Sequence, residues 1–86
     1  MATVRRAKSF LQDYRSLPKE IQGRVDKQLG LLLSNPRHPS LRLKRLKGTD
    51  RYEIRISQVY RLPFRSSDQV LELRRIGTHD LLRQEG

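Results

Sequence analysis

The sequence predicts an α+β fold, in which an N-terminal helical hairpin packs on a small antiparallel sheet and a short helix forms the C-terminal tail. Two changes in pattern predict this class. Apolar residues recur at helical spacing up to residue 33, and from residue 41 they alternate with polar residues as in half-buried strands. With 86 residues, the chain is expected to form a single domain, residues 1–86.

The first half of the chain predicts a short strand over residues 2–5 and then two helices. From residue 7, apolar residues at helical spacing form one face of the first helix. Pro18 can open the second helix because proline is tolerated in a first helical turn. Asn35-Pro36 ends the second helix, since the residue before proline is pushed out of the helical region. A connection this short predicts an antiparallel pair. The residues of the first face are Ala7, Phe10, Leu11, Tyr14 and Leu17.

The second half predicts a loop over residues 37–40 and strands over 41–46, 52–56, 60–65 and 70–76. Turns are expected at 48–50, 57–58 and 66–68. Pro63 lies inside a strand and cannot donate to the ladder, which predicts a bulge or an edge there. Residues 78–84 predict the tail helix, capped by Thr78.

Alternation along these strands assigns side chains to faces. Tyr52, Ile54 and Ile56 are expected to point toward the helices, with Tyr60, Leu62 and Phe64 beside them. The opposite face would then carry four charged residues, which are Glu53, Arg55, Arg61 and Arg65.

The charge of the chain is strongly positive, at +10, with 14 arginines and 5 lysines. Residues 37–65 hold nine of these cations and only two acidic residues. Such a surface predicts a polyanionic partner, whether RNA, DNA, an anionic membrane or an acidic protein. The excess of arginine fits bidentate phosphate recognition, and it fits a GC-rich genome equally well.

Several classes of site are disfavoured. The chain has no cysteine, which excludes disulfides and thiolate metal sites. Its two histidines lack a clustered third ligand, so we expect no metal site and no cofactor. No apolar stretch resembles a signal peptide or approaches the roughly 20 residues of a membrane span. We therefore expect a cytoplasmic protein without a membrane partner.

A series of short motifs runs along nearly the whole chain. The most specific feature is a Tyr-Arg-Leu motif followed by a Gly-x-His motif. With them the sequence resembles the RelE/ParE superfamily of bacterial toxin–antitoxin toxins. The motifs are Phe10 and Tyr14 in the first helix, Leu17-Pro18, Asn35-Pro36, Leu46-Lys47-Gly48, Tyr52-Glu53-Ile54-Arg55, Tyr60-Arg61-Leu62 and Gly77-Thr78-His79-Asp80.

The resemblance implies an activity and a partner. Most such toxins cleave mRNA in the ribosomal A site, and an antitoxin from an adjacent gene wraps and neutralises them. Metal-free cleavage needs a group that removes the 2′-hydroxyl proton, cations at the phosphate and an acid for the leaving oxygen. We therefore expect a ribosome-dependent, metal-independent mRNA endoribonuclease.

The resemblance also implies catalytic residues. Arg61 matches the arginine that contacts the scissile phosphate, and Arg55 matches a catalytic or phosphate-binding strand position. His79 falls where several relatives have a catalytic histidine, and a histidine side chain suits proton transfer near neutral pH. Glu53 stands where some relatives have lysine. It is either a base or an ion-pair partner of Arg55 or Arg61.

Other polar residues have weaker assignments. Lys44, Arg45, Lys47 and Arg65 are candidates for holding mRNA or ribosomal RNA phosphates, although a basic run is often only a solvated face. His38 is expected to be a surface residue. The tail beyond His79 lacks the C-terminal aromatic residue that many relatives use to stack on a base.

The expected partners are mRNA on the ribosome and a cognate antitoxin that presents an acidic, amphipathic segment, in a toxin–antitoxin hetero-oligomer. Two other functions fit the same chain. One is a ParE-like inhibitor of DNA gyrase, which has no need of the Gly-x-His element. The other is a non-catalytic basic module that binds RNA or protein.

Overall fold

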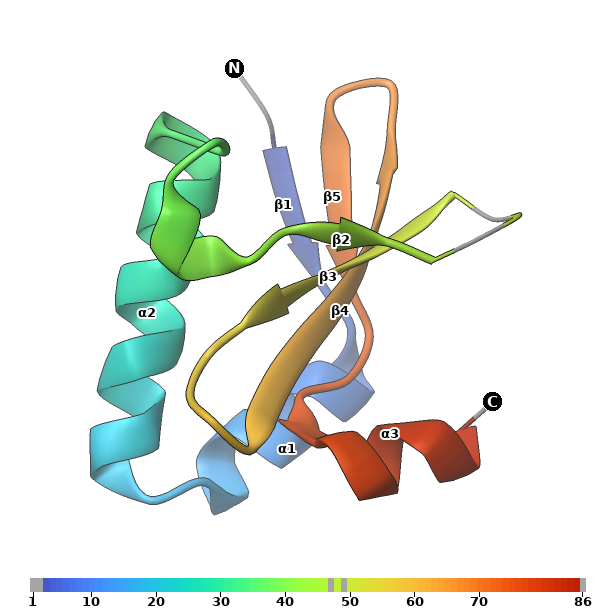
Figure 1. Ribbon diagram of the computed structural model, residues 1–86. Helices are drawn as coiled ribbons and strands as arrows, with labels where there is room; N and C mark the ends of the chain where they lie inside the picture. Colours follow the sequence, from blue (N-terminus) through green and yellow to red (C-terminus); the bar gives the residue numbers. More distant parts are fainter. Residues whose placement is uncertain (1–2, 47, 49, 86) are drawn as a thin grey trace.

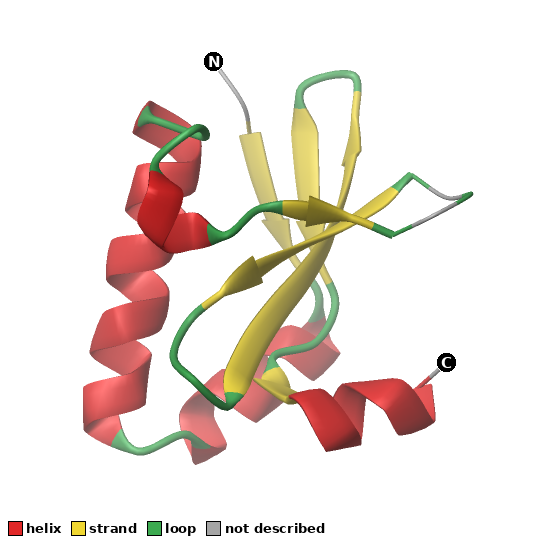
Figure 2. Ribbon diagram, in the orientation of Figure 1, coloured by secondary structure: helices red, strands yellow, loops and turns green. Residues whose placement is uncertain are grey.

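The structure is a computed structural model that describes residues 3–46, 48 and 50–85. Its fold is α+β, with two helices packed on a mixed sheet (Figure 1; Figure 2). The elements in chain order are β1 (Thr3–Arg6), α1 (Lys8–Ser16), α2 (Lys19–Ser34), the 3₁₀ turn η1 (Pro39–Leu41), β2 (Lys44–Arg45), β3 (Arg51–Arg55), β4 (Tyr60–Ser67), β5 (Val70–Leu73), β6 (Gly77–Thr78) and α3 (His79–Glu85).

The sheet is mixed, so the expectation of an antiparallel sheet was wrong at one edge. Its order is β1-β5-β4-β3-β2, with β6 paired to β4. β1 runs parallel to β5, from Thr3 opposite Val70 to Arg6 opposite Leu73, and the other pairs are antiparallel. Parallel strands need a long connection, which the chain from α1 to β4 supplies, and alternation alone does not reveal strand direction.

The two helices cover one face of the sheet. Figure 1 shows α2 standing along one side of the sheet and α1 passing at its lower end. They are joined where the Tyr14 hydroxyl donates to Asp26 Oδ1 at 2.9 Å and Gln22 Nε2 donates to the Tyr14 carbonyl at 2.8 Å. Burial, with the bond to Asp26, raises the pKa of Tyr14. The antiparallel alignment of the two helices stays a prediction.

The core lies between this helix layer and the sheet. As expected, β3 and β4 turn their apolar residues toward the helices, and Ile54 and Leu62 are fully buried. The rings of Tyr52 and Phe64 stack across the two strands at 5.5 Å. The buried apolar residues are Phe10, Val25, Leu29, Leu32, Leu41, Ile54, Ile56, Leu62, Phe64, Leu71, Leu73 and Ile76.

The strand expected over residues 41–46 is much shorter. Leu41 closes η1 and is fully buried, and β2 covers only Lys44–Arg45, after which the Leu46 N–H donates to the Arg51 carbonyl at 2.9 Å. Arg42 has φ of 47°, a left-handed conformation that interrupts any strand before β2. The expected loop over 37–40 contains the start of η1, where His38 Nδ1 accepts from the Ser40 N–H at 3.2 Å.

Two of the expected turns are displaced. β4 continues to Ser67, and the turn lies at Asp68 and Gln69, whose φ angles of 46° and 63° suit a two-residue hairpin loop. The turn expected at 57–58 is longer and spans residues 56–59. The polar residues Ser66 and Ser67, which suggested a turn, are tolerated at the exposed end of β4.

Pro63 sits in an unbroken β3–β4 register opposite Glu53, so the expected bulge is absent. The Ile56 N–H donates to the Tyr60 carbonyl at 3.0 Å, and the alternation of an antiparallel ladder then turns the Pro63 nitrogen away from β3. On that side β4 pairs with β5 through residues 64–67 and with β6 through 60–61. Pro63 therefore occupies a local edge, where no donor is needed.

The last strand ends at Leu73 rather than residue 76, because α1 holds the following segment. Asp13 accepts from Arg75 Nε at 2.7 Å and Nη2 at 3.2 Å, and from the Ile76 N–H at 3.1 Å. The Ser9 hydroxyl donates to the Arg74 carbonyl at 2.6 Å. These contacts redirect the chain into β6 and α3.

The C-terminal helix α3 begins at His79. The Leu81 N–H donates to Thr78 Oγ1 at 3.3 Å, which satisfies one of the donors that a helix leaves unpaired in its first turn. No helix in the described part of the chain has the length and apolar character needed to cross a membrane.

Replacing Asp13 tests how strongly α1 holds this segment. Asp13→Asn removes the charge that binds Arg75, and we expect the free energy of unfolding to fall by about 2 kcal/mol, because hydrogen bonds to charged groups are worth roughly that much. Urea denaturation measures it. Glu20→Gln is the control, since Glu20 is exposed and lies 3.9 Å from Arg24. Equal stability of the two variants would contradict the role given to Asp13.

Candidate active site

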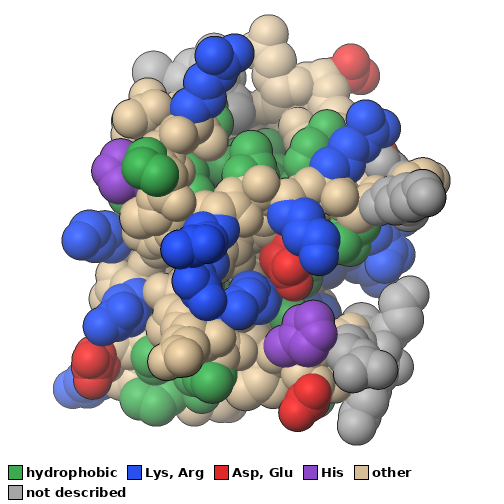
Figure 3. Space-filling model, in the orientation of Figure 1, with side chains coloured by type: hydrophobic (Ala, Val, Ile, Leu, Met, Phe, Trp, Pro, Cys, Tyr) green, Lys and Arg blue, Asp and Glu red, His purple; other side chains and the backbone are tan. Residues whose placement is uncertain are grey.

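A pocket of about 270 Å³ opens on the outer face of the sheet, the face turned away from α1 and α2. We call it the outer pocket. Figure 3 shows Lys and Arg side chains spread over this view of the molecule, with acidic side chains and histidine among them. The pocket is lined by Lys44, Leu46, Arg51, Glu53, Pro63, Phe64, Arg65, Glu72, Arg74, Arg75, His79 and Leu82.

The strand register places the charged lining residues in rows. Lys44 lies opposite Glu53, which lies opposite Pro63. In the next row Arg65 lies between Arg51 on β3 and Glu72 on β5. Residues directly opposite each other share a face and are close enough to interact, so each carboxylate sits beside a cation.

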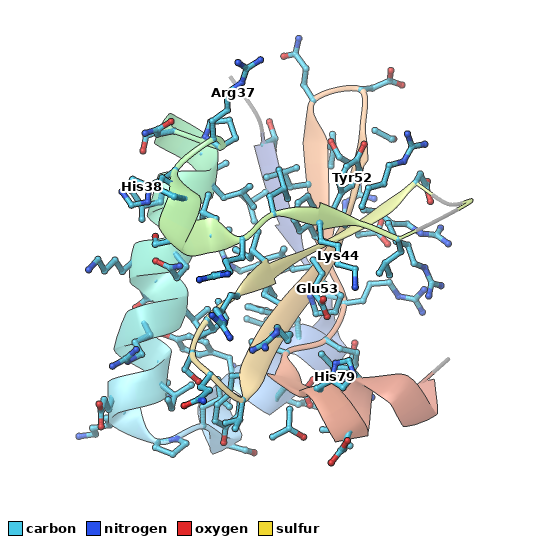
Figure 4. All side chains as sticks on the ribbon, viewed as in Figure 1. Arg37, His38, Lys44, Tyr52, Glu53 and His79 are labelled. Atoms are coloured by element: carbon cyan, nitrogen blue, oxygen red, sulfur yellow. The ribbon has the colours of Figure 1, made fainter. Side chains whose placement is uncertain are left out.

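His79 reaches the same pocket from the start of α3. The backbone N–H of His79 donates to the Val59 carbonyl at 3.2 Å, and the preceding Thr78 pairs with Tyr60 of β4. Figure 4 shows His79 on the same side of the sheet as Lys44 and Glu53. The fold therefore brings two predicted catalytic residues, Glu53 and His79, to one pocket.

Arg55 and Arg61 occupy the adjacent row. They lie opposite each other on β3 and β4, as a hairpin requires, and Gly77 pairs with Arg61 on its other side. Neither lines the outer pocket, and Arg55 instead lines a second groove beside α2. The four predicted catalytic residues thus lie near one another. Glu53 and His79 line the outer pocket, Arg55 lines the second groove, and Arg61 lines neither.

The side chain of Arg61 turns back toward the β3–β4 turn. Its Nη1 donates to the carbonyls of Ser57 at 2.7 Å, Gln58 at 3.0 Å and Tyr60 at 3.0 Å. Like charges opposite each other on paired strands repel, and these carbonyls offer the cation a better environment. The structure therefore gives Arg61 a structural role that the sequence did not suggest.

The predicted RNA-binding residues divide in the same way. Lys44 and Arg65 line the outer pocket, and Arg65 also lies 3.6 Å from Asp50. Arg45 lies over the ring of Tyr52, 5.9 Å from its centroid, and is not a lining residue. Lys47 falls outside the described residues.

Sequence reasoning missed part of the lining. Arg51 precedes Glu53 by two residues, so alternation would have placed it on the outer face. Arg74 follows the end of β5, and no periodic signal identifies it. Leu46, just after β2, and Leu82 of α3 supply apolar surface. Together with Pro63 they give the pocket an apolar part beside its charged rim.

This combination suits a nucleotide. An apolar surface can hold a base, the cations can hold a phosphate, and Glu53 and His79 can exchange protons with it. Among the described residues, no group of three or more His, Cys, Asp and Glu is placed to hold a metal ion.

The contacts of Arg61 generate a stability prediction. We expect Arg61→Ala to lower the free energy of unfolding by about 1.5 kcal/mol, since three turn carbonyls lose a charged donor. Arg65→Ala is the control, because its ion pair is exposed, and we expect it to change stability by less than about 0.5 kcal/mol. Thermal and urea unfolding measure both, and a neutral Arg61→Ala would show that the turn does not need this side chain.

Comparison with known proteins gives no match to a protein-family model and no match to a curated protein. Solved structures do match. The E. coli DinJ–YafQ complex gives a TM-score of 0.80 at 17% identity, covering 95% of this chain and 98% of the matched chain. The intact E. coli RelBE toxin–antitoxin complex gives 0.73 at 24% identity, covering 91% and 96%.

A copper-bound mutant toxin from Helicobacter pylori gives a TM-score of 0.72 at 26% identity, covering 95% of this chain and 99% of that one. These neighbours agree with the resemblance indicated by the sequence motifs. The chain has the fold of the RelE-like toxins of type II toxin–antitoxin systems.

Proposed function

We propose that residues 1–86 form the toxin of a type II toxin–antitoxin system, and that this toxin is a metal-independent endoribonuclease that cleaves mRNA on the ribosome. One observation carries the proposal: Glu53 and His79 line a single pocket rimmed by cations, on a fold whose solved neighbours include toxins in complex with antitoxins. The cytoplasm, where ribosomes translate, is the proposed location.

The pocket supplies a general base and a general acid. In this proposal Glu53 takes the proton of the ribose 2′-hydroxyl, whose oxygen then bonds to the adjacent phosphorus. Protonated His79 donates to the departing 5′-oxygen as its bond to phosphorus breaks. The products are a 2′,3′-cyclic phosphate and a 5′-hydroxyl, and no metal or external reactant is needed.

Cations around the pocket would stabilise the charge that develops on the phosphate. Lys44 and Arg65 belong to the pocket itself, and Arg55 and Arg61 follow in the next row of the same face. Binding of Arg61 Nη1 by the turn carbonyls fixes where this guanidinium lies, so Arg61 is proposed as a positioned cation. The proposed contacts for flanking mRNA and the ribosome are Lys44, Arg45, Lys47 and Arg65.

An antitoxin would have to cover this surface. An acidic segment complements the cations, and its apolar side chains would fit the apolar part of the outer pocket formed by Leu46, Pro63 and Leu82. Such a segment competes directly with RNA, which gives a simple means of neutralisation in a toxin–antitoxin hetero-oligomer.

The two histidines of the chain offer a matched test of His79. Inducible expression without an antitoxin should arrest bacterial growth, with cuts inside translated codons seen by primer extension on a reporter mRNA. His79→Gln should lower cleavage by about 10² or more, the usual contribution of a general acid. His38→Gln should cleave normally, because His38 caps η1 and does not line the pocket.

Other outcomes would move the function elsewhere. Growth arrest with intact mRNA and a DNA-damage response would indicate gyrase as the target. Harmless expression of well-folded protein would indicate a non-catalytic binding module. Undiminished cleavage by His79→Gln would remove His79 from the mechanism while leaving the nuclease activity in place.

The role of Glu53 is tested by its amide. Glu53→Gln keeps the shape of the side chain and removes the base, so single-turnover cleavage on purified ribosomes should fall by about 10² or more. Glu20→Gln, with an exposed acid on α2, is the control. Normal cleavage by Glu53→Gln would reduce Glu53 to an ion-pair partner.

A further inference from the structure

A second hollow lies between α2 and the β3–β4 turn, and we call it the α2 groove. Its volume is about 620 Å³. We propose that this groove is a second RNA-binding site, which holds phosphates of the same RNA strand that enters the outer pocket; the proposal rests on the proposed function. The groove is lined by Arg24, Lys27, Gln28, Ser40, Arg55, Ile56, Ser57 and Gln58.

The charge of the groove is of one sign. Among the described residues, its lining includes three cations, Arg24, Lys27 and Arg55, and no acidic residue, whereas that of the outer pocket includes two acids. Arg24 and Lys27 are three residues apart on α2 and so share a face of the helix. The Arg24–Glu20 pair, at 3.9 Å and well exposed, offers little competition for an incoming phosphate.

Gln28 fixes the distance between the helix cations and Arg55. Its side chain is buried, at 7% exposed, and its Nε2 donates to the Arg55 carbonyl at 3.0 Å and to the Ser40 carbonyl at 3.2 Å. These bonds tie α2 to the end of β3 and to η1. The cations of the groove are therefore mounted on elements joined by a buried amide.

The position of Arg55 places the groove next to the outer pocket along β3. Arg55 and Glu53 are two residues apart on β3 and share its outer face, so they are separated by about 7 Å along the strand. A single RNA strand with one nucleotide in the outer pocket would therefore pass next over Arg55 and the α2 cations.

The chemistry of the lining favours nucleic acid over a protein segment. Within the part of the chain that the structure describes, Ile56 is the one apolar residue in the lining and is 4% exposed. The groove therefore offers no anchor for the apolar face of a docked helix. Ser40, Ser57 and Gln58 supply neutral polar groups that suit phosphate and sugar oxygens. An acidic antitoxin segment finds its apolar contacts in the outer pocket instead.

Fluorescence anisotropy with labelled single-stranded RNA tests the groove, using protein with His79→Gln so that bound RNA stays intact. A trimer covers the outer pocket, and a decamer reaches the groove as well. Adding Arg24→Ala with Lys27→Ala should weaken decamer binding at least tenfold at low salt. It should also reduce the slope of log affinity against log salt by about 1.4, from two lost phosphate contacts. Trimer binding should change little.

Lys8→Ala with Arg37→Ala is the control, because it removes the same charge from exposed positions that line neither hollow. The proposal would be overturned if both pairs of substitutions weakened decamer binding equally. It would also be overturned if trimer and decamer binding weakened equally, or if decamer affinity did not change. Two further outcomes would overturn it, both with normal decamer binding. If the variant no longer co-sediments with ribosomes, the groove is a ribosome contact; if it no longer binds an acidic antitoxin, the groove is an antitoxin contact.

Cleavage in cells separates this proposal from the proposed function. With His79 intact, the Arg24→Ala and Lys27→Ala pair should reduce cleavage of the reporter mRNA, while the Lys8→Ala and Arg37→Ala pair should not. If the wild-type chain cleaves and both pairs cleave equally, the groove proposal fails alone. If the wild-type chain makes no cut, the nuclease itself fails.

Discussion

The carboxylate of Asp13 is the contact on which the candidate site depends. It holds Arg75 with two hydrogen bonds and accepts a third from the Ile76 N–H, while Ser9, one turn earlier on α1, holds the Arg74 carbonyl. With side-chain exposures of 18% for Asp13 and 26% for Arg75, the pair is sheltered enough to matter energetically. It takes the chain out of the sheet after β5 and delivers it to β6, and His79 follows directly. A residue of the first helix thus determines where the last imidazole of the chain lies.

Two residues without polar side chains complete this arrangement. Pro63 needs no donor partner, so the sheet tolerates the space between β5 and β6 beside it. Gly77 lies against Leu81, and an added Cβ would stand 2.8 Å from the Leu81 Cδ2. The contact is with the end of the exposed Leu81 side chain, in the first turn of α3.

The outer face was predictable from sequence because a strand has a period of two. That period alone places Glu53 and Arg55 on one side of β3, and hairpin pairing then brings Arg55 opposite Arg61. The side-chain direction of Arg61 was not predictable, since a long side chain can follow carbonyls that only the folded turn brings within reach. The parallel β1–β5 pair and the end of β5 were missed for a related reason. They depend on contacts between residues more than 60 positions apart, such as Asp13 with Arg75, which leave no periodic trace.

The helix layer organises both hollows from behind the sheet. Asp13 of α1 fixes the segment that leads to His79, and Gln28 of α2 fixes the end of the strand that carries Arg55. Both are polar residues on helix faces that would otherwise be apolar. Gln28 donates to two backbone carbonyls, and Asp13 binds the Arg75 side chain together with the Ile76 N–H. Cations on one sheet face repel one another, and these attachments hold in place the strand and the segment that carry them. The outer face can then concentrate positive charge around Glu53, which lies between Lys44 and Pro63 in the strand register.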